Sequence, residues 1–413
     1  MPDEIAVIGG GIVGANIGYH LSRKTDRPIT VYEKNQSLVS ETTAKSIASW
    51  SFKPTQTNDD ANPPDVTENE LFQMKQYGME FYNKLLSQPR TDSWYELIGE
   101  LSVATTKEGA EILASDAATQ DGLPATSTGE YLSREELRQK IVCPELDTES
   151  IEGALYHPYI GVFAPENLAM EVVKRAKEHG VTFELGAPVT DIRVENDRVT
   201  GIAVDGKHIE TSATICASGG WNAGLARCAG IDIPVQYTAG YTMEVNPQPR
   251  LCHTLPKLDH HESPVGFCGH KGDTSLIYQT GPSANFDEFY DQAKDHDPSA
   301  FDDELPSSVH ERFRNEAELL VPALAKGETV VEHATLLSRT PDAQPIVGWT
   351  ELQGFSIAAL HAAGIQLAPA IGHIIATQLV DGDPTAFHDY VSISRFKDYD
   401  ETPYALTESD ETR

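Results

Sequence analysis

Six residues near the N-terminus constrain the fold of this chain more than any other feature. Gly9-Gly10-Gly11-Ile12-Val13-Gly14 fits the pattern G-x-G-x-x-G. It follows an apolar run at 5–8, typical of a strand buried on both faces, and it opens a segment with helical periodicity. The three fixed glycines permit a tight turn, close approach of the backbone to a pyrophosphate, and close packing of helix on strand. The pattern therefore predicts an α/β dinucleotide-binding domain.

An acidic residue stands where such a domain would hold a ribose. A second strand is expected over 29–32, and Glu33 follows it, nineteen residues after Gly14. A carboxylate there can accept hydrogen bonds from a ribose diol and would repel a 2′-phosphate. The N–H groups at the start of the first helix would hold the phosphates. The alternative, a glycine turn in an α/β domain that binds no dinucleotide, would leave Glu33 unexplained. The motif alone does not decide whether the dinucleotide is FAD or NAD.

The charge balance of the chain excludes some partners. Its 413 residues carry 63 acidic and 31 basic side chains, a formal net charge of −32. Such a surface repels nucleic acid and anionic lipid, so we expect neither as a partner. The acidic excess is spread along the chain, which fits either a high-salt cytoplasm or simple solubility. The length suits two domains of about 100–200 residues each.

Other features argue against a secreted, membrane-spanning or metal-binding protein. The five cysteines form no dense framework, and the N-terminus Met1-Pro-Asp-Glu lacks the basic region of a signal peptide, so we expect a cytoplasmic protein. The apolar stretch 359–380 contains polar residues and a proline, which favours a strand, a loop and a helix over a membrane span. The cysteines and histidines at 252–270 lack paired C-x-x-C elements, so we expect no metal site.

Periodicity and turn signals predict further elements. An Asn196-Asp197 turn and an Asp205-Gly206 turn should connect three strands into a meander. Residues 53–70 read as a loop, and the tail after 396 as frayed. Helices are expected over 71–86, 131–140, 167–179, 284–295, 308–320 and 369–380, and strands over 189–194, 199–204, 209–211, 214–217, 330–337 and 355–360.

Seven short motifs carry a resemblance to a known family. They are Ile5-Ala-Val-Ile-Gly-Gly-Gly-Ile-Val-Gly-Ala15, Val31-Tyr-Glu-Lys34, Thr42-Thr-Ala-Lys-Ser46, Gly153-Ala-Leu-Tyr156, Cys216-Ala-Ser-Gly-Gly-Trp221, Thr340-Pro-Asp-Ala-Gln-Pro-Ile-Val-Gly348 and Gly364-Ile-Gln-Leu-Ala-Pro-Ala-Ile-Gly372. Because these motifs occur in the same order as in the family, the chain resembles the D-amino-acid oxidase/sarcosine oxidase/glycine oxidase family of FAD-dependent oxidoreductases. Their joint occurrence is far more specific than any one motif. Residues 75–150 and 246–330 match poorly.

The resemblance implies the architecture and the cofactor. It implies an α/β fold with a Rossmann-like FAD-binding domain built from 1–75, 150–230 and 335–385. A mixed or antiparallel-sheet substrate domain would be inserted at 76–149 and 231–334, followed by a tail at 386–413. FAD should bind non-covalently, because Thr335 stands where monomeric sarcosine oxidases carry a cysteine. The implied FAD contacts are Gly9, Gly11, Ile12, Val13, Gly14, Glu33, Lys34, Thr42, Thr43, Ser46, Val189, Ser218, Gly219, Trp221, Gly364, Ile365, Gln366 and Leu367.

The C-terminal motif gains a chemical role from the resemblance. A loop at 364–367 and a helix starting near Pro369 would point N–H groups and a positive dipole end at the flavin pyrimidine ring. Proline suits the first turn of a helix, where its missing N–H costs nothing.

The implied reaction is oxidation of the C–N bond of a small amine or amino acid. The flavin takes a hydride from the carbon beside a neutral amine, the imine hydrolyses, and oxygen or another acceptor reoxidises the flavin. Many members carry an arginine for the substrate carboxylate where this chain has Leu337, and Arg339 lies two residues later on the same strand face. Arg339, His361 and Lys45 are the candidate catalytic residues, although each also fits a structural or solvated role.

Three alternatives stay open. The missing arginine position also fits a flavin-holding subunit of a larger complex. The same fold could instead oxidise an alcohol such as a glycerol phosphate, or pass electrons to an acceptor other than oxygen. A homo-oligomer is compatible with all of these functions.

Overall fold

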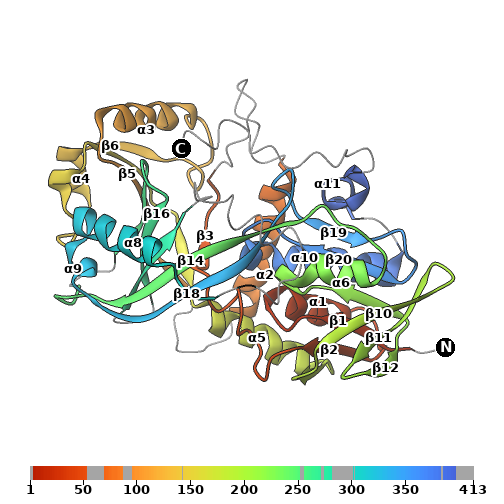
Figure 1. Ribbon diagram of the computed structural model, residues 1–413. Coiled ribbons are helices and arrows are strands. Elements are labelled where there is room, and N and C mark those ends of the chain that lie inside the picture. The colour runs from red at the N-terminus through yellow and green to blue at the C-terminus, as the bar shows by residue number, and fades with distance from the viewer. Residues whose placement is uncertain are drawn as a thin grey trace.

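Two large sheets organise the chain (Figure 1). The computed structural model describes residues 3–53, 69–86, 95–141, 143–251, 255–270, 274–280, 301, 303–382 and 385–396. A six-stranded sheet has the order β19-β20-β13-β1-β2-β9, and an eight-stranded sheet has the order β18-β14-β17-β16-β15-β5-β7-β6. The predicted mixed α/β fold class is confirmed.

The six-stranded sheet is mostly parallel. The central strand β1 pairs in parallel with β2 and β13, β13 pairs with β20, and β2 pairs with β9, while the edge strand β19 is antiparallel. All four residues of β1 are buried, as its apolar run predicts. The strands are β1 (Ile5–Ile8), β2 (Ile29–Glu33), β9 (Thr182–Leu185), β13 (Ala213–Cys216), β19 (Ile346–Trp349) and β20 (Phe355–Ala359).

Both faces of this sheet are covered. Ile5 and Val7 of β1 pack into the core formed with the helices, and Ala6 and Ile8 pack into a separate core on the opposite face. The helical layer contains α1 (Ile12–Ser22), α2 (Glu70–Leu86), α5 (Pro165–Glu178) and α10 (Gly364–Asp381). The opposite layer contains α6 (Asn222–Cys228) and the meander β10 (Val189–Glu195), β11 (Arg198–Val204) and β12 (Lys207–Glu210).

The eight-stranded sheet packs against helices α8 (Ser307–Leu320) and α9 (Pro322–Ala325) on one face. Helix α3 (Lys107–Thr119) packs against β5 and β7. The two long strands of the eight-stranded sheet, β14 and β18, run from the left half of Figure 1 towards the six-stranded sheet. The strands are β5 (Glu100–Ala104), β6 (Glu130–Ser133), β7 (Gly153–His157), β14 (Gln236–Asn246), β15 (Lys257–His260), β16 (Val265–His270), β17 (Thr274–Gln279) and β18 (Glu328–Arg339).

Most predicted elements are present. Asn196, Asp197 and Asp205 take left-handed backbone angles in the two expected turns of the meander. The predicted helix at 131–140 is divided into β6 and α4 (Arg134–Lys140), where Ser133 and Glu136 form a capping box. Helix α3 was not predicted, and the helix expected at 284–295 lies outside the described residues. A small sheet joins β3 (Ser49–Trp50), β8 (Gly161–Phe163) and β4 (Tyr95–Leu97).

The predicted start of the C-terminal helix is wrong. Helix α10 begins at Gly364, so the segment 364–367 is its first turn and not a loop. Pro369 lies inside the helix, where its ring nitrogen leaves the carbonyl of Ile365 without its usual partner. The buried Tyr82 of α2 donates to that carbonyl at 2.9 Å. A tertiary hydrogen bond therefore replaces the missing helical one and lets the proline stay in the helix.

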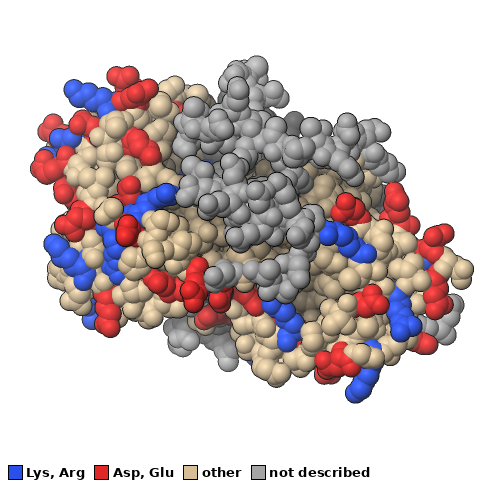
Figure 2. All heavy atoms as spheres, in the orientation of Figure 1, with Lys and Arg blue, Asp and Glu red and all other residues tan. Residues whose placement is uncertain are grey.

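The surface reflects the composition. Asp and Glu side chains are distributed over both halves of the face in Figure 2, with Lys and Arg between them. The acidic excess is thus not confined to one patch of this face. Within the described ranges, no helix is both long enough and apolar enough to cross a membrane.

Candidate active site

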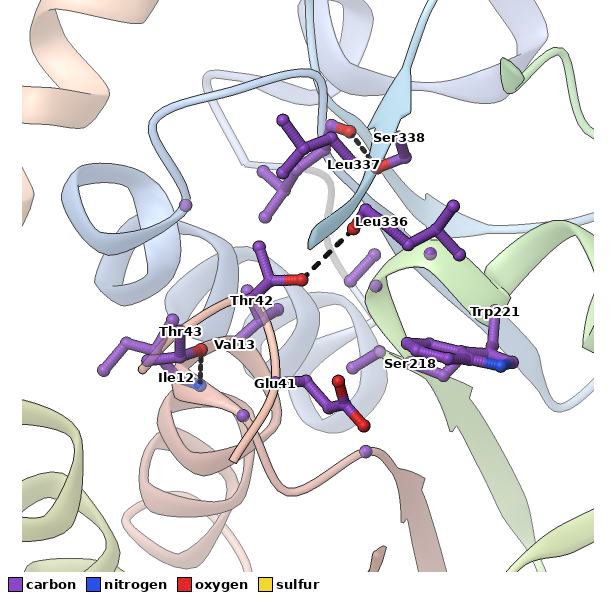
Figure 3. Close-up of a pocket in the computed structure, with 18 of the residues that line it drawn as sticks. Ile12, Val13, Glu41, Thr42, Thr43, Ser218, Trp221, Leu336, Leu337 and Ser338 are labelled. Carbon is purple, nitrogen blue, oxygen red and sulfur yellow. Dashed lines mark hydrogen bonds between the residues drawn. The ribbon is translucent and has the colours of Figure 1, made fainter. Parts of the chain in front are cut away.

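A cavity of about 1010 Å³ lies at the carboxyl ends of β1, β2, β13 and β20. In a parallel sheet these ends meet at one edge, which is where open α/β folds bind their ligands. The loop at 39–46, the segment 336–339 of β18 and the first turn of α10 also line it, together with residues at 188–190, 219–227, 239–240 and 279–280. Figure 3 shows part of this wall, with side chains contributed by segments far apart in the sequence.

The glycine turn at the end of β1 has no room for side chains. Gly9 has φ +113°, and a Cβ built on it would lie 2.5 Å from the carbonyl oxygen of Ala217. A Cβ on Gly14 would lie 1.9 Å from the carbonyl oxygen of Gly9. The turn therefore needs Gly9 for its backbone angle and Gly14 for contact between helix and strand, as the motif predicts.

Glu33 lies at the end of β2 and is 7% exposed at the cavity wall. Its Oε2 accepts from the backbone N–H of Gly10 at 2.8 Å, and its Oε1 accepts from Asn35 N–H at 2.8 Å. Because a carboxylate has about four acceptor sites, both oxygens can still accept a further hydrogen bond. The side chain can thus hold the glycine turn and bind a diol at once.

Lys34 connects two walls of the cavity. Its Nζ lies 3.6 Å from the centre of the Trp221 ring and 3.1 Å from Glu41 Oε1. Asn35 donates to the same Glu41 oxygen at 2.9 Å. Burial alone would raise the pKa of the Glu41 carboxyl. The hydrogen bonds from Asn35 and Lys34 outweigh this effect and hold its pKa below the ordinary value. Figure 3 labels both Glu41 and Trp221 among the residues that line the cavity.

The loop at 40–46 fastens the start of α1 to β18. The Thr43 hydroxyl accepts from the backbone N–H of Ile12 at 3.2 Å, and Thr42 donates to the carbonyl of Leu336 at 3.2 Å (Figure 3). Lys45 donates to the carbonyl of Ala334 at 3.4 Å. Lys45 is not among the described residues that line the cavity, so the structure does not bring this predicted catalytic residue to the site.

Asn222 is a buried hub that holds the loop after β13. Its Oδ1 accepts from the N–H of Ser218 at 2.8 Å and from the Ser218 hydroxyl at 2.9 Å. Its Nδ2 donates to the carbonyl of Ala358 at the end of β20, at 3.0 Å. One fully buried amide therefore joins two strand ends at the cavity floor. Asn222 was not predicted from the sequence, where its only signal is its place two residues after the glycine pair at 219–220.

The first turn of α10 contributes less than predicted. Ala363 takes a left-handed conformation with φ 57°, and Gly364 and Ile365 line the cavity. Gln366 is turned away, and its Nε2 donates to the carbonyl of Ser49 at 2.8 Å. Leu367 is part of the hydrophobic core. The side chains of Gln366 and Leu367 are thus directed into the protein, and neither residue is among the described residues that line the cavity.

Arg339 and His361 meet at the cavity. Arg339 Nη1 lies 3.0 Å from His361 Nε2, and the backbone N–H of Thr340 donates to His361 Nδ1 at 3.1 Å. Burial and the neighbouring Arg339 lower the pKa of His361 to about 4. The ring is therefore neutral at pH 7, and two of the three predicted catalytic residues are neighbours.

The cavity gathers most of the predicted contacts. Gly14, Lys45, Gln366 and Leu367 lie outside its lining, and Glu41, Leu336 and Arg227 line it without having been predicted. The predicted residues that line it are Gly9, Gly11, Ile12, Val13, Glu33, Lys34, Thr42, Thr43, Ser46, Val189, Ser218, Gly219, Trp221, Arg339, His361, Gly364 and Ile365.

The histidine-rich segment at 252–270 shows no metal centre in its described part. His260 pairs with Glu316 at 2.6 Å and with Glu262 at 3.1 Å. Among the described residues, no group of three or more His, Cys, Asp or Glu is arranged to hold a metal ion. The carboxylates around His260 connect β15 to α8 and to the loop at 262.

A parallel sheet with a glycine turn, a helix N-terminus and an acidic strand end at one cavity defines a dinucleotide-binding α/β protein. The comparisons narrow this class. The model of the FAD dependent oxidoreductase family matches residues 4–378. The chain belongs to this family, which implies FAD as the cofactor.

Individual relatives are similar over nearly all of the chain. It is 27% identical over 406 residues to 4-methylaminobutanoate oxidase (formaldehyde-forming) of Paenarthrobacter nicotinovorans, covering 94% of this chain and 45% of that protein. It is 25% identical to glycine oxidase of Geobacillus kaustophilus, covering 93% and 94%. The crystal structure of that glycine oxidase superposes with a TM-score of 0.75 at 22% identity over 95% and 98% of the chains, which shows the shared fold. The chain spans less than half of the first relative and nearly all of the second.

Proposed function

We propose that this protein is an FAD-dependent oxidase or dehydrogenase that oxidises the C–N bond of a small amine or amino acid. The observation that carries the proposal is the continuous cavity between the Glu33 end and the Arg339–His361 end. Its volume of about 1010 Å³ lies at the upper end of ordinary ligand pockets, about 300–1000 Å³, which suits a large cofactor such as a dinucleotide. Family membership and relatives named for amine and amino-acid oxidation support it.

The residues present fit FAD. The cradle at Gly9 and Gly14 excludes side chains, and the N-cap Gly11 of α1 has no side-chain cap, which suits a pyrophosphate at a helix start. Glu33 would hold the ribose, and Lys34 and Trp221 would close the cavity beside it. Bound FAD would supply the two-electron acceptor for the carbon next to the substrate nitrogen.

The chain's own groups would orient the reactants and exclude water. The first turn of α10 would direct its N–H groups towards the flavin, as would the neighbouring backbone at 361–363. Arg339 and His361 would contact the substrate or the flavin, whereas Lys45 would act through the loop at 40–46, because its side chain reaches the Ala334 carbonyl. Position and desolvation would thus contribute more than proton transfer by a side chain.

The finer assignments are part of the same proposal. FAD would be held non-covalently, since position 335 is a buried threonine rather than a thiol. The FAD-binding domain would comprise 1–75, 150–230 and 335–385, and the substrate domain 76–149 and 231–334. The strand β7, at 153–157, is the exception within 150–230: it pairs with β5 and β6 in the eight-stranded sheet and would belong with the substrate domain. The protein would act in the cytoplasm, with oxygen or another electron acceptor.

The test is an anaerobic titration of the purified protein. The purified protein should show flavin absorption bands. Denaturation should release the flavin into solution, because it is not linked covalently. Secondary amines, D-amino acids and glycine derivatives are then added separately, and bleaching of the flavin by one class identifies the substrate. A protein that holds flavin but is bleached by none of them would contradict the proposal and favour the flavin-holding subunit. A protein that binds no flavin would contradict both.

A further inference from the structure

Arg227, in the last turn of α6, lines the cavity without having been predicted to do so. Two contacts place it at the Glu33 end. The backbone N–H of Ala187 donates to the carbonyl of Glu33 at 2.8 Å. Three residues further on, Thr190 lines the cavity, and its carbonyl lies 4.0 Å from the sulfur of Cys228, beside Arg227. Glu33 and Arg227 therefore border the same short segment of the cavity wall.

The guanidinium of Arg227 has more donors than the acceptors around it can satisfy. Its Nε lies 3.6 Å from Asp232 Oδ1, which is too long for a hydrogen bond, and the Asp232 side chain is 81% exposed. Its Nη2 is buried, and no described residue accepts a hydrogen bond from it. An exposed ion pair contributes little to stability, whereas a buried donor without an acceptor is costly. The side chain would therefore gain from an acceptor placed in the cavity.

Lys34, a second cation near Glu33, is differently placed. Its Nζ lies 3.1 Å from Glu41 Oε1 and 3.6 Å from the centre of the Trp221 ring. A carboxylate and an aromatic face thus already hold its charge. Of these two cations, Arg227 is the one whose donors are available for a ligand.

The order of the groups along the cavity indicates which acceptor Arg227 would meet. In the proposed function the glycine turn holds the pyrophosphate and Glu33 holds the ribose. The base is the next group beyond the ribose, and the wall next to Glu33 includes residues at 188–190 and 221–227. Adenine has ring nitrogens that accept hydrogen bonds, and a guanidinium only donates them.

We propose that Arg227 recognises the adenine ring of FAD, and that its guanidinium turns from Asp232 to donate a hydrogen bond to a ring nitrogen. The inference rests on the proposed function, because it takes FAD as the occupant of the cavity. It extends that function by assigning the base to a named side chain outside the glycine turn and the strand end at Glu33.

The first experiment tests whether Arg227 responds to the base. Flavin-free protein labelled with ¹⁵N-arginine is examined by NMR, and the Nε–H signal of Arg227 is assigned with Arg227→Lys. We expect this signal to shift on addition of ADP and to stay unchanged with pyrophosphate, which lacks the adenosine. A signal that ignores ADP, or that shifts equally with both probes, would overturn the proposal.

The second experiment measures affinity. Dissociation constants of FAD and ADP are determined with flavin-free protein, by flavin fluorescence for FAD and by displacement of FAD for ADP. Arg227→Leu removes the donors, while Arg227→Lys keeps the charge on a compact ammonium group without the planar fork. Arg193→Leu, at an exposed position on β10, is the control for the change in net charge.

We expect Arg227→Leu to weaken the binding of FAD and of ADP by the same factor, about 10- to 100-fold. Arg227→Lys should recover part of this loss, and Arg193→Leu should bind both ligands as the wild type does. A leucine variant that matches the control would contradict the proposal. A loss for FAD without a loss for ADP would contradict it as well, because the contact would then lie outside the adenosine half.

Asp232→Asn tests the proposed movement of the guanidinium. The substitution removes the weak competitor for Arg227, so ADP should bind equally well or up to about fivefold more tightly. The same substitution made together with Arg227→Leu should leave ADP affinity at the value of Arg227→Leu alone. Weaker ADP binding in Asp232→Asn would show that the ion pair must stay intact, which would overturn the proposed turn towards the base.

The outcomes separate this inference from the proposed function. A wild type that is bleached by an amine, but whose Arg227→Leu variant binds ADP as tightly, refutes the adenine contact alone. A wild type that holds FAD and is bleached by no amine refutes the proposed function. In that case the titrations of flavin-free protein with ADP still test Arg227.

Discussion

The backbone N–H of Gly10 donates a 2.8 Å hydrogen bond to Glu33 Oε2, which joins the glycine turn after β1 to the end of β2. A second hydrogen bond from Asn35 N–H fixes the other oxygen of the carboxylate. Glu33 therefore helps set the conformation of the turn that would hold the pyrophosphate. If it also binds the ribose, as proposed above, one carboxylate would couple the two ends of an adenosine diphosphate site.

Replacing Glu33 with glutamine should weaken FAD binding by roughly ten-fold or more, because the neutral amide keeps one acceptor and loses the charge-assisted bonds. The dissociation constant is measured by flavin fluorescence with flavin-free protein. Glu195→Gln, at an exposed position on β10, is the matched control. Equal affinities for wild type and Glu33→Gln would show that the carboxylate does not contact the cofactor.

Replacing Gly14 with alanine should destabilise the protein even without flavin, because the new Cβ would lie 1.9 Å from the Gly9 carbonyl oxygen. The expected loss in unfolding free energy is about 1–3 kcal/mol or more, since helix and strand must separate. Urea unfolding of flavin-free protein measures it. Gly364→Ala is the control, because its Cβ would meet only Leu360 at an ordinary 3.5 Å. Similar losses in the two variants would argue against the steric explanation.

The sequence predicted the parts of the site that local patterns determine. The apolar run of β1, the glycine turn and Glu33 follow one another within one βαβ unit, so their contacts could be anticipated. The start of α10 could not, because Pro369 is tolerated there through Tyr82, a residue nearly three hundred positions away. Helix α3 was missed although Thr106 caps it, since its alanine-rich sequence has only a weak apolar stripe.

Replacing Asn222 with leucine should cost about 2–4 kcal/mol of unfolding free energy, because it leaves the Ser218 N–H and the Ala358 carbonyl without their buried partner. The loop after β13 should also loosen and release flavin more readily. Urea unfolding and the flavin dissociation rate measure the two effects. Asn83→Leu, at an exposed position on α2, is the control. Retained stability in Asn222→Leu would show that the amide is not the hub described above.

His20 should make the stability of the protein fall in acid. Burial, His373 and Lys24 lower its pKa to about 3, so the unfolded chain takes up a proton below about pH 6.5 while the folded protein resists it. Unfolding free energy should therefore drop, relative to His20→Phe, by up to about 1.4 kcal/mol per pH unit below 6.5. Phenylalanine suits the aromatic surroundings of Tyr77 and Phe81. Urea unfolding at pH 7.5, 6 and 5 tests this, with the exposed His208→Phe as control. Parallel pH profiles of unfolding free energy for wild type and His20→Phe would show that the lowered pKa of His20 is not the cause of the loss of stability in acid.

Tyr82 and Pro369 should be thermodynamically coupled through the Ile365 carbonyl. Tyr82 donates a hydrogen bond to it, and Pro369 removes the helical N–H that would otherwise do so. Tyr82→Phe removes the hydroxyl that donates to the Ile365 carbonyl, and Pro369 cannot replace it because it has no N–H. The expected cost is about 1–3 kcal/mol for an unsatisfied buried carbonyl. Pro369→Ala restores a helical N–H to that carbonyl, so Tyr82→Phe should cost much less in its presence.

A double-mutant cycle by urea unfolding measures this coupling. We expect an interaction energy of about 1 kcal/mol or more in the direction of rescue, because only one of the two donors is needed. The flavin spectrum provides a second readout, since Ile365 also lines the cavity and a shifted first turn of α10 would change the surroundings of the flavin. Additive effects of the two substitutions would mean that Tyr82 stabilises the protein by packing alone.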